Sequence, residues 1–338
     1  MAQAQLPLEQ PTRKNTPPSE DSTSSRGFFS ADNSFLWLFP GFGLLLVYAI
    51  FPLLYNIYVS FQEWNLMSRR FVSVGGENWR VIWYTFFVVP FMNLTGGDST
   101  AFLRDNLDFD QVQSVERLGS SALITLQYVM VALVLQIILG LVIALLLDAG
   151  PWGAGLMQSM MILPMVIAPA IAGMIFRLLL HSEFGGIQWL LYQINITTPE
   201  EPLLGGSGDN ALAALLVVDV WQWTPFFIII ILAGLKGLPQ EVLEASAVDG
   251  ANFFQRLFRI KLPLLRGVLL IAVLFRLIDL YRVYDYVHIM TSGGPANKTE
   301  TLSYYTGSQL GLLQWGWLGT LSVVILIIAW VSAYLYQR

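Results

Sequence analysis

The chain has 338 residues, of which 55% are hydrophobic and only 12% are charged. This composition predicts an all-α polytopic membrane protein, because soluble domains rarely combine so few charges with so many apolar residues. The net charge of −5 argues against a nucleic-acid surface, and the lack of cysteine excludes disulfides and thiolate metal sites. With only two histidines, a zinc site built from protein ligands is not expected, and no cofactor is expected either.

The first 33 residues are rich in Pro, Ser, Thr and Gln. Such a composition cannot bury enough apolar surface to fold, so residues 1–33 are predicted to be a disordered cytoplasmic tail. The tail lacks the short apolar core of a signal peptide. Residues 34–338 are predicted to form one membrane domain.

Six apolar stretches in this domain are long enough to cross roughly 30 Å of hydrocarbon, which defines the six predicted transmembrane helices. They run approximately over Phe35–Phe61, Ser121–Leu147, Leu156–Leu180, Ala211–Leu235, Leu264–Met290 and Trp317–Tyr336. Pro164 and Pro169 interrupt the third stretch and Pro225 interrupts the fourth, either as tolerated kinks or as devices that widen a path.

The basic residues indicate the orientation of the domain. Residues 62–118 form a polar connection between the first two stretches, and residues 239–263 connect the fourth to the fifth. The second connection and its flanks are basic, with Lys236, Arg256, Arg259, Lys261 and Arg266, whereas the connections after the third and fifth stretches carry only Lys298. The positive-inside rule therefore places residues 239–263 and both termini in the cytoplasm, and residues 62–118 outside. The arginines within 62–118 depart from this pattern, but long loops are translocated with less regard to charge.

Residues 239–263 are short, amphipathic and charged. Pro239 suits a first helical position, and Glu244 brings negative charge close to the helix start, where the peptide dipole is positive. Gly250 is predicted to end the helix in a left-handed conformation, and Pro263 closes the segment. On periodicity alone this is equally well an ordinary interfacial helix.

Three short motifs in this segment distinguish it from an ordinary interfacial helix. Glu244-Ala245-Ser246, Asp249-Gly250-Ala251 and Ile260-x-Leu262-Pro263 resemble the EAA signature of binding-protein-dependent ABC importer permeases. The resemblance implies the ABC type I importer permease fold, in which this segment is a cytoplasmic coupling helix that docks in a cleft of an ATPase subunit. The coupling residues implied are Glu244, Ala245, Asp249, Gly250 and Ala251.

Further motifs narrow the resemblance. Asp219-x-Trp221-x-x-x-Pro225, Thr291-Ser-Gly-Gly-Pro295 with Thr299-Glu-Thr-Leu302, and Phe71–Gly75 with Asn78-Trp79 look like carbohydrate importer permeases of the maltose type, specifically the first subunit of the pair. The similarity covers most of residues 35–338, apart from an apparent insertion around residues 85–115. It implies a complex with a second permease subunit, two ATPase subunits and an extracytoplasmic solute-binding protein in the inner membrane.

Charged residues inside the apolar stretches are candidates for a substrate path. Asp219 and Arg276 both fall near the bilayer midplane, counted from the ends of their stretches at 1.5 Å per residue. A charge there costs at least about 2.5–3.5 kcal/mol and requires a partner or water. With Gln222, Trp223 and Asp279 they combine hydrogen-bonding groups and an aromatic face, which suits a neutral polyhydroxylated solute. A purely structural ion pair of Arg276 with either aspartate explains the charges equally well. Asp285 and His288, near the outer interface, are weaker candidates.

The sequence thus predicts a permease subunit that moves a sugar, such as a disaccharide, an oligosaccharide or a glycosylated compatible solute, and that catalyses no reaction itself. No phosphate-binding Gly-x-x-x-x-Gly-Lys-Ser/Thr run occurs, so ATP hydrolysis is assigned to partner subunits. One alternative is import of glycerol phosphate or another small anion bound by Arg276 and Arg282. Another is an ion-driven secondary carrier in which Asp219 titrates.

Overall fold

The computed structural model describes residues 34–65, 69–205 and 210–337, so the predicted tail of residues 1–33 lies outside the described residues. The chain forms two compact units, Met1–Leu53 and Leu54–Arg338. In the first unit lie α1 (Ser34–Leu45), the π-helical turn η1 (Leu46–Ile50) and the start of α2 (Phe51–Val59). Residues Leu38–Val59 are apolar and long enough to cross a membrane. The first predicted stretch is therefore helical.

The second unit is built from long apolar helices. These are α6 (Phe109–Asp148), α7 (Ala154–Val166), α8 (Pro169–Leu179), α10 (Ala211–Lys236), α13 (Leu262–Leu280) and α15 (Trp315–Gln337). Among the described residues, Leu38–Val59, α6, α10 and α15 are long and apolar enough to span a bilayer, and α7 with α8 would make a fifth span. The mostly helical membrane fold is thereby confirmed. The count of six spans stays a prediction. Helix α13, which corresponds to the fifth predicted stretch, is not among these candidates, because its 19 residues include three charged ones, Arg266, Arg276 and Asp279.

The third predicted stretch is broken just before Pro169, whereas Pro164 lies inside α7 and does not break it. Helices α7 and α8 meet at an angle of 95°. Ile167 and Ala168 between them have extended backbone, with ψ of 133° and 136°. Since proline disfavours a helical conformation in the residue before it, Pro169 starts a new helix instead of continuing α7. Pro225, in contrast, lies inside the continuous helix α10, so its predicted interruption does not break that helix.

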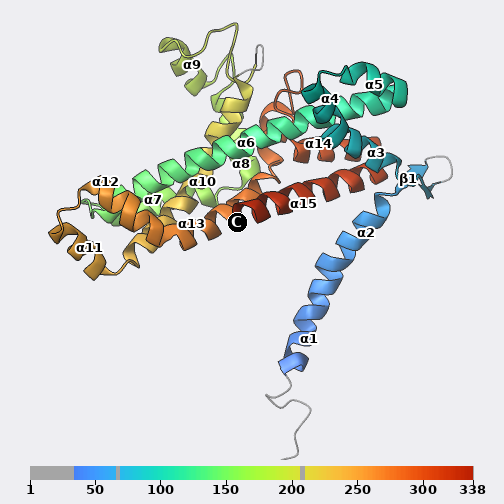
Figure 1. The fold of residues 1–338 in the computed structure, drawn as a ribbon. Helices are drawn as coiled ribbons and strands as arrows, with labels where there is room; N and C mark the ends of the chain where they lie inside the picture. Colours follow the sequence, from blue (N-terminus) through green and yellow to red (C-terminus); the bar gives the residue numbers. More distant parts are fainter. Residues whose placement is uncertain (1–33, 66–68, 206–209, 338) are drawn as a thin grey trace, which may run out of the picture. The chain divides into compact units, whose positions relative to one another are not determined.

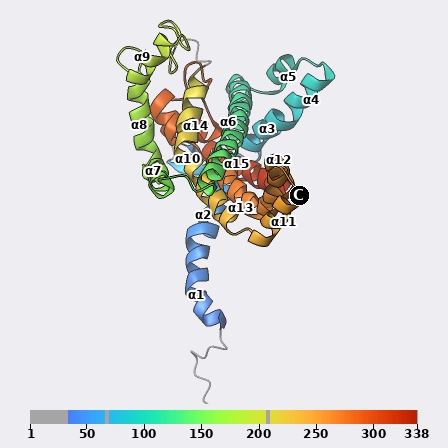
Figure 2. The ribbon, with the colours of Figure 1, turned by 90° about the vertical axis from the view of Figure 1, so that its left-hand side faces the viewer.

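Helix α10 is the central helix of the second unit. Its apolar part is the most deeply buried of the candidate spans, and it packs between α6, α7 and α13 (Figures 1 and 2). The packing against α6 is close because Gly140 has no side chain: a Cβ atom built there would lie 2.5 Å from Cβ of Phe227. The backbones of α6 and α10 approach each other at this point as small residues permit in membrane bundles.

Replacing Gly140 by alanine is expected to destabilise the subunit by about 1–3 kcal/mol, because the added methyl group overpacks the contact with Phe227. The matched control is Gly267→Ala, since a Cβ atom at Gly267 meets nothing within 4 Å. Heat-induced loss of the folded, monodisperse protein in detergent measures both variants. Equal melting temperatures for the two variants would show that the α6–α10 contact tolerates a side chain.

The described residues of the predicted connection, 62–65 and 69–118, are structured. They form the antiparallel hairpin β1 (Gln62–Asn65) and β2 (Arg70–Ser73), with Gln62 opposite Ser73, followed by α3 (Glu77–Trp83), η2 (Tyr84–Val88), α4 (Val89–Thr95), α5 (Ser99–Asn106) and the first turns of α6. Helix α6 has 40 residues and begins at Phe109, so it starts twelve residues before the predicted span. Hydropathy predicted only the apolar part of α6. The helix also includes the polar residues before Ser121, which hydropathy does not detect. At 1.5 Å per residue α6 is about 60 Å long, twice the hydrocarbon thickness.

The two ends of the helical unit differ. Figure 1 shows α11 (Gln240–Val248) and α12 (Phe253–Arg256) at one end, and α3, α4 and α5 at the other. Figure 2 shows α7, α8 and α9 (Gly186–Gln193) on the opposite flank of α6 from α3–α5. The fifth predicted stretch is shorter than expected, because α13 ends at Leu280. It is followed by the short elements η4 (Val287–Thr291), α14 (Leu302–Ser308) and η5 (Gln309–Leu312).

Candidate substrate path and coupling segment

Asp219 of α10 and Arg276 of α13 form an ion pair inside the helical unit. Nη2 of Arg276 donates to Oδ1 and Oδ2 of Asp219 at 2.5 and 2.6 Å. The two side chains are only 1% and 2% exposed. Buried charges persist when they are paired and hydrogen-bonded, and these two satisfy that condition by neutralising each other. In this conformation the two residues bind each other.

The remaining donors of Arg276 are also engaged. Nη1 donates to Oδ2 of Asp279, one helical turn further along α13, and Nε donates to Oε1 of Gln136 at 3.0 Å. The amide nitrogen of Gln136 in turn donates to Oδ2 of Asp219 at 3.0 Å. Gln136 on α6 is fully buried and was not among the predicted site residues. Its signal was available in the sequence, as a lone amide within the apolar run from Tyr128 to Leu147.

Trp223 and Gln222 extend the cluster along α10. The guanidinium carbon of Arg276 lies 4.6 Å from the centroid of the Trp223 ring, a cation–π contact. Gln222 accepts a hydrogen bond from the hydroxyl of Tyr286 at 2.6 Å and donates to the carbonyl of Ile167 at 2.5 Å. That carbonyl lies at the break between α7 and α8, so it lacks the backbone N–H that would bond to it in a continuous helix. Gln222 therefore connects the broken helix pair to the segment after α13.

The cluster lines a small cavity of about 70 Å³ that is partly open to the surface. Its charged lining consists of Asp219, Arg276, Asp279, Arg282 and Asp285, and Trp223 lies beside them. Arg282 and Asp285 are themselves exposed. Of the weaker candidates, Asp285 lines the cavity, whereas His288 is exposed and stacks on Tyr284 with ring centroids 5.2 Å apart.

Accessibility divides the predicted path residues into two kinds. The side chain of Asp279 is 40% exposed and Trp223 is partly exposed, whereas Asp219, Gln222 and Arg276 are buried. Asp279 and Trp223 can thus contact a solute without breaking the Asp219–Arg276 ion pair, and both contact the buried guanidinium group of Arg276.

The predicted coupling helix is α11, and it ends as expected at Gly250. This glycine has φ +76°, its N–H donates to the carbonyl of Ala247 at 3.1 Å, and the N–H of Ala251 donates to the carbonyl of Ser246 at 3.0 Å. These bonds form a Schellman motif, whose left-handed position strongly favours glycine. Pro239 is the N-cap and not the first helical residue as predicted, so the helix starts one residue later.

The predicted coupling residues form an exposed surface. Glu244, Ala245, Asp249 and Gly250 are exposed and Ala251 is half-buried. After the turn, α12 starts with a capping box between Asn252 and Gln255, and the segment is then tied to the end of α6 by an ion pair between Lys261 and Asp148 at 3.1 Å. The capping box and the ion pair thus fix the position of the exposed turn, as docking to another protein requires.

A bundle of membrane-length helices with a buried polar cluster and an exposed, tied-down helix at one end is typical of a transport component. Residues 136–338 match the family of binding-protein-dependent transport system inner membrane components. The chain belongs to this family, whose members are transport subunits and not enzymes.

Two curated relatives cover most of the chain. It is 34% identical over 266 residues to the probable ABC transporter permease protein y4oQ of Sinorhizobium fredii, which covers 79% of this chain and 76% of the relative. It is 28% identical over 315 residues to the trehalose/maltose transport system permease protein MalF of Thermococcus litoralis, which covers 93% and 96% of the two chains.

A solved structure has the same fold. The chain resembles a chain of a bacterial alginate ABC transporter, crystallised with an alginate pentasaccharide-bound periplasmic protein, with a TM-score of 0.59 and 18% identity over 76% of this chain and 89% of that chain. The fold of an ABC importer permease is thereby confirmed.

Proposed function

We propose that this chain is the first of two permease subunits of an ATP-driven importer that carries a neutral sugar, such as a disaccharide, across the inner membrane. The observation that carries this proposal is the polar cavity around Asp219 and Arg276, with an aromatic face and a carboxylate accessible beside it. Trp223 offers a stacking face for a pyranose, and Asp279 accepts hydrogen bonds from hydroxyl groups. The trehalose/maltose permease among the relatives supports the same class of solute.

The charges around the cavity favour a neutral solute over an anion. Three carboxylates face two guanidinium groups there, and Arg276 is already neutralised by Asp219 and Asp279. An imported phosphate would have to approach this excess of negative charge with only Arg282 to attract it. The glycerol phosphate alternative is therefore the weaker one. The second alternative, an ion-driven secondary carrier, is not supported by the family to which the chain belongs.

In the proposed assembly the chain has six spans, with α13 as the fifth, residues 62–118 outside the membrane and both termini in the cytoplasm. A second permease subunit, two ATPase subunits and an extracytoplasmic solute-binding protein complete the importer. Surrounding lipid covers the exposed apolar faces of α6 and α15, in keeping with their composition.

We assign transmission of the ATPase motion to the turn at Glu244, Ala245, Asp249, Gly250 and Ala251. When the ATPase subunits close, α11 moves with them as a rigid body, because the Schellman motif and the capping box fix the turn. The Lys261–Asp148 ion pair passes this movement to α6, and the cavity opens to one side or the other.

The path residues have two different roles in this proposal. Trp223 and Asp279 contact the sugar, whereas Asp219, Gln222 and Arg276, together with Gln136, hold these two groups in position. No bond of the sugar is made or broken.

Replacing Trp223 by alanine is expected to lower sugar uptake up to about tenfold, because loss of a stacking face of up to about 1.4 kcal/mol corresponds to that factor. The matched control is Trp221→Ala on the same helix, whose ring is 40% exposed and packs on Phe176 away from the cavity. Uptake of radiolabelled trehalose, maltose and glycerol 3-phosphate by vesicles containing the whole complex measures the effect. Equal losses for both tryptophans would remove Trp223 from the path, and uptake of glycerol 3-phosphate alone would contradict the neutral-sugar assignment.

A further inference from the structure

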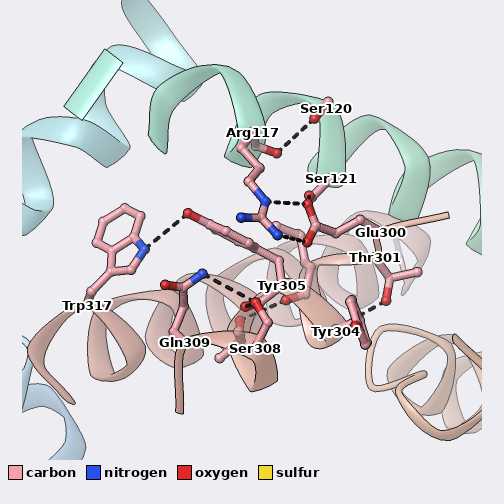
Figure 3. A network of polar contacts seen from close by, with 12 residues as sticks. Arg117, Ser120, Ser121, Glu300, Thr301, Tyr304, Tyr305, Ser308, Gln309 and Trp317 are labelled. Atoms are coloured by element: carbon pink, nitrogen blue, oxygen red, sulfur yellow. Dashed lines mark hydrogen bonds and ion pairs between the residues drawn. The ribbon is translucent and has the colours of Figure 1, made fainter. Parts of the chain in front are cut away.

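A polar stripe runs along the end of α6 that lies away from the coupling segment. Arg117, Ser121 and Thr125 are spaced four residues apart and therefore share one helix face. The path described above does not include them. All three contact the start of α14 or the residues just before it: Arg117 and Ser121 contact Glu300 (Figure 3), and Thr125 contacts Leu302, the first residue of α14.

The central contact is a two-pronged ion pair. Nε and Nη2 of Arg117 donate to Oε2 and Oε1 of Glu300 at 2.7 and 2.6 Å. Ser121 adds a longer hydrogen bond of 3.4 Å to Oε2, and Thr125 Oγ1 accepts the backbone N–H of Leu302 at 2.8 Å. The Glu300 side chain is 1% exposed, so its charge depends on Arg117 for compensation. Parallel N–H···O bonds of this kind also fix orientation, which a single bond does not.

Aromatic residues hold Arg117 from the other side. Its guanidinium carbon lies 5.1 Å from the centroid of the Tyr305 ring, and the Tyr305 hydroxyl accepts a hydrogen bond from Trp317 of α15 at 3.2 Å (Figure 3). Arg117 of α6 thus contacts Tyr305 of α14, and Tyr305 in turn contacts Trp317 of α15.

The same segment is bonded to the wall of the cavity. The hydroxyl of Thr301, next to Glu300, donates to the carbonyl of Val283 at 3.1 Å. Val283 lies in the wall of the cavity around Arg276, and Tyr286, three residues later, donates to Gln222. A continuous chain of contacts therefore leads from the Arg117–Glu300 pair to Val283 and Tyr286, which line the cavity.

We propose that Arg117 and Glu300 are positioning residues that latch residues 282–286 over the cavity and so keep the outer side of the path closed. This inference rests on the proposed import function for its direction, because the latched end is the extracytoplasmic one only in that orientation. Opening the path outward requires residues 282–286 to leave the cavity, which pulls on Thr301 and on the buried Glu300. The pair therefore opposes outward opening until the rest of the complex favours it.

A latch and a merely structural ion pair differ in one measurable property, the access of water to the cavity wall. Because the chain has no cysteine, a single Val283→Cys substitution provides a specific reporter. The whole importer complex is reconstituted in vesicles, and the rate of labelling by a membrane-impermeant maleimide from the extracytoplasmic side is measured. A second reporter, Ser182→Cys on an exposed loop residue outside the latch, checks the reagent and the orientation.

We expect Glu300→Gln to raise the labelling rate of the Val283→Cys reporter about tenfold and to leave the Ser182→Cys reporter unchanged. Glu77→Gln is the matched control, since Glu77 forms an exposed ion pair with Arg80, with side chains 51% and 43% exposed. Should Glu300→Gln fail to accumulate, Arg117→Gln replaces it, because the Arg117 side chain is 41% exposed and its loss is tolerated more easily. The double reversal Arg117→Glu with Glu300→Arg is expected to restore slow labelling.

Labelling rates that stay at the wild-type value in a folded Glu300→Gln or Arg117→Gln complex would overturn the latch. Faster labelling of both reporters together would also overturn it, because it indicates general loosening. Stimulation of ATP hydrolysis by a sugar-loaded binding protein is recorded on the unsubstituted complex in parallel. It reports on the proposed function alone, so failure of the latch and failure of the importer assignment are told apart.

Discussion

Replacing Arg276 by methionine is expected to destabilise the subunit by about 3–5 kcal/mol, because it leaves the buried carboxylate of Asp219 without its partner. Asp219 is 1% exposed and receives both short hydrogen bonds of Nη2, and Gln136 alone cannot neutralise its charge. Sugar uptake is expected to be lost as well, since Asp279 and Trp223 both contact the guanidinium group. Heat-induced unfolding of the purified subunit or complex in detergent measures the first effect, and vesicle uptake measures the second.

Two further variants show whether the effect of Arg276→Met comes from the ion pair. Arg266→Met is the matched control, because Arg266 lies on the same helix and is exposed, and it is expected to change stability little. The double variant Asp219→Asn with Arg276→Met removes both charges and is expected to recover most of the lost stability without recovering uptake. A double variant as unstable as Arg276→Met would show that the ion pair is not the source of the effect.

Replacing Gly250 by valine is expected to abolish coupled transport while leaving ATP hydrolysis active. The residue has φ +76°, and a β-branched side chain in this left-handed region costs about 1–3 kcal/mol, so the turn between α11 and α12 is expected to change conformation. A Cβ atom there meets nothing within 4 Å, so the effect arises from the backbone and not from crowding. Uptake and ATP hydrolysis, measured on the same reconstituted complex, separate coupling from assembly.

Gly250→Asn is the informative control for that substitution, because asparagine tolerates the left-handed conformation better than any β-branched residue. It is expected to retain a substantial part of uptake. Gly237→Ala, at a nearby helix end with φ of −85°, is expected to behave as the wild type. If Gly250→Val imports sugar at the normal rate, the assignment of this turn as the coupling element is wrong.

Part of this architecture was predictable from short-range sequence features. The left-handed end of α11 follows from one glycine, and the break between α7 and α8 follows from one proline, Pro169. The common depth of Asp219 and Arg276 follows from the rise per residue along their helices. In each of these cases the physical cause lies within a few residues of the feature it determines.

The features that were missed depend on other parts of the chain or on polar helical turns. Helix α6 extends twelve residues beyond its apolar part, because hydrogen bonds of the backbone do not require apolar side chains. The role of Gln136 arises only when α6 packs against α10 and α13. The partners Arg117 and Glu300 are 183 residues apart, and no periodicity in the sequence connects them.

The central claim is that this chain belongs to an importer driven by a sugar-loaded binding protein. Its most direct test is ATP hydrolysis by the complex, purified with its neighbouring gene products in lipid, against binding protein loaded with monosaccharides, disaccharides, oligosaccharides, glycosylated polyols or glycerol 3-phosphate. Our account predicts that binding protein loaded with one kind of neutral sugar stimulates hydrolysis and that empty binding protein does not. Stimulation by glycerol 3-phosphate alone, or a complex that contains no ATPase, would contradict it.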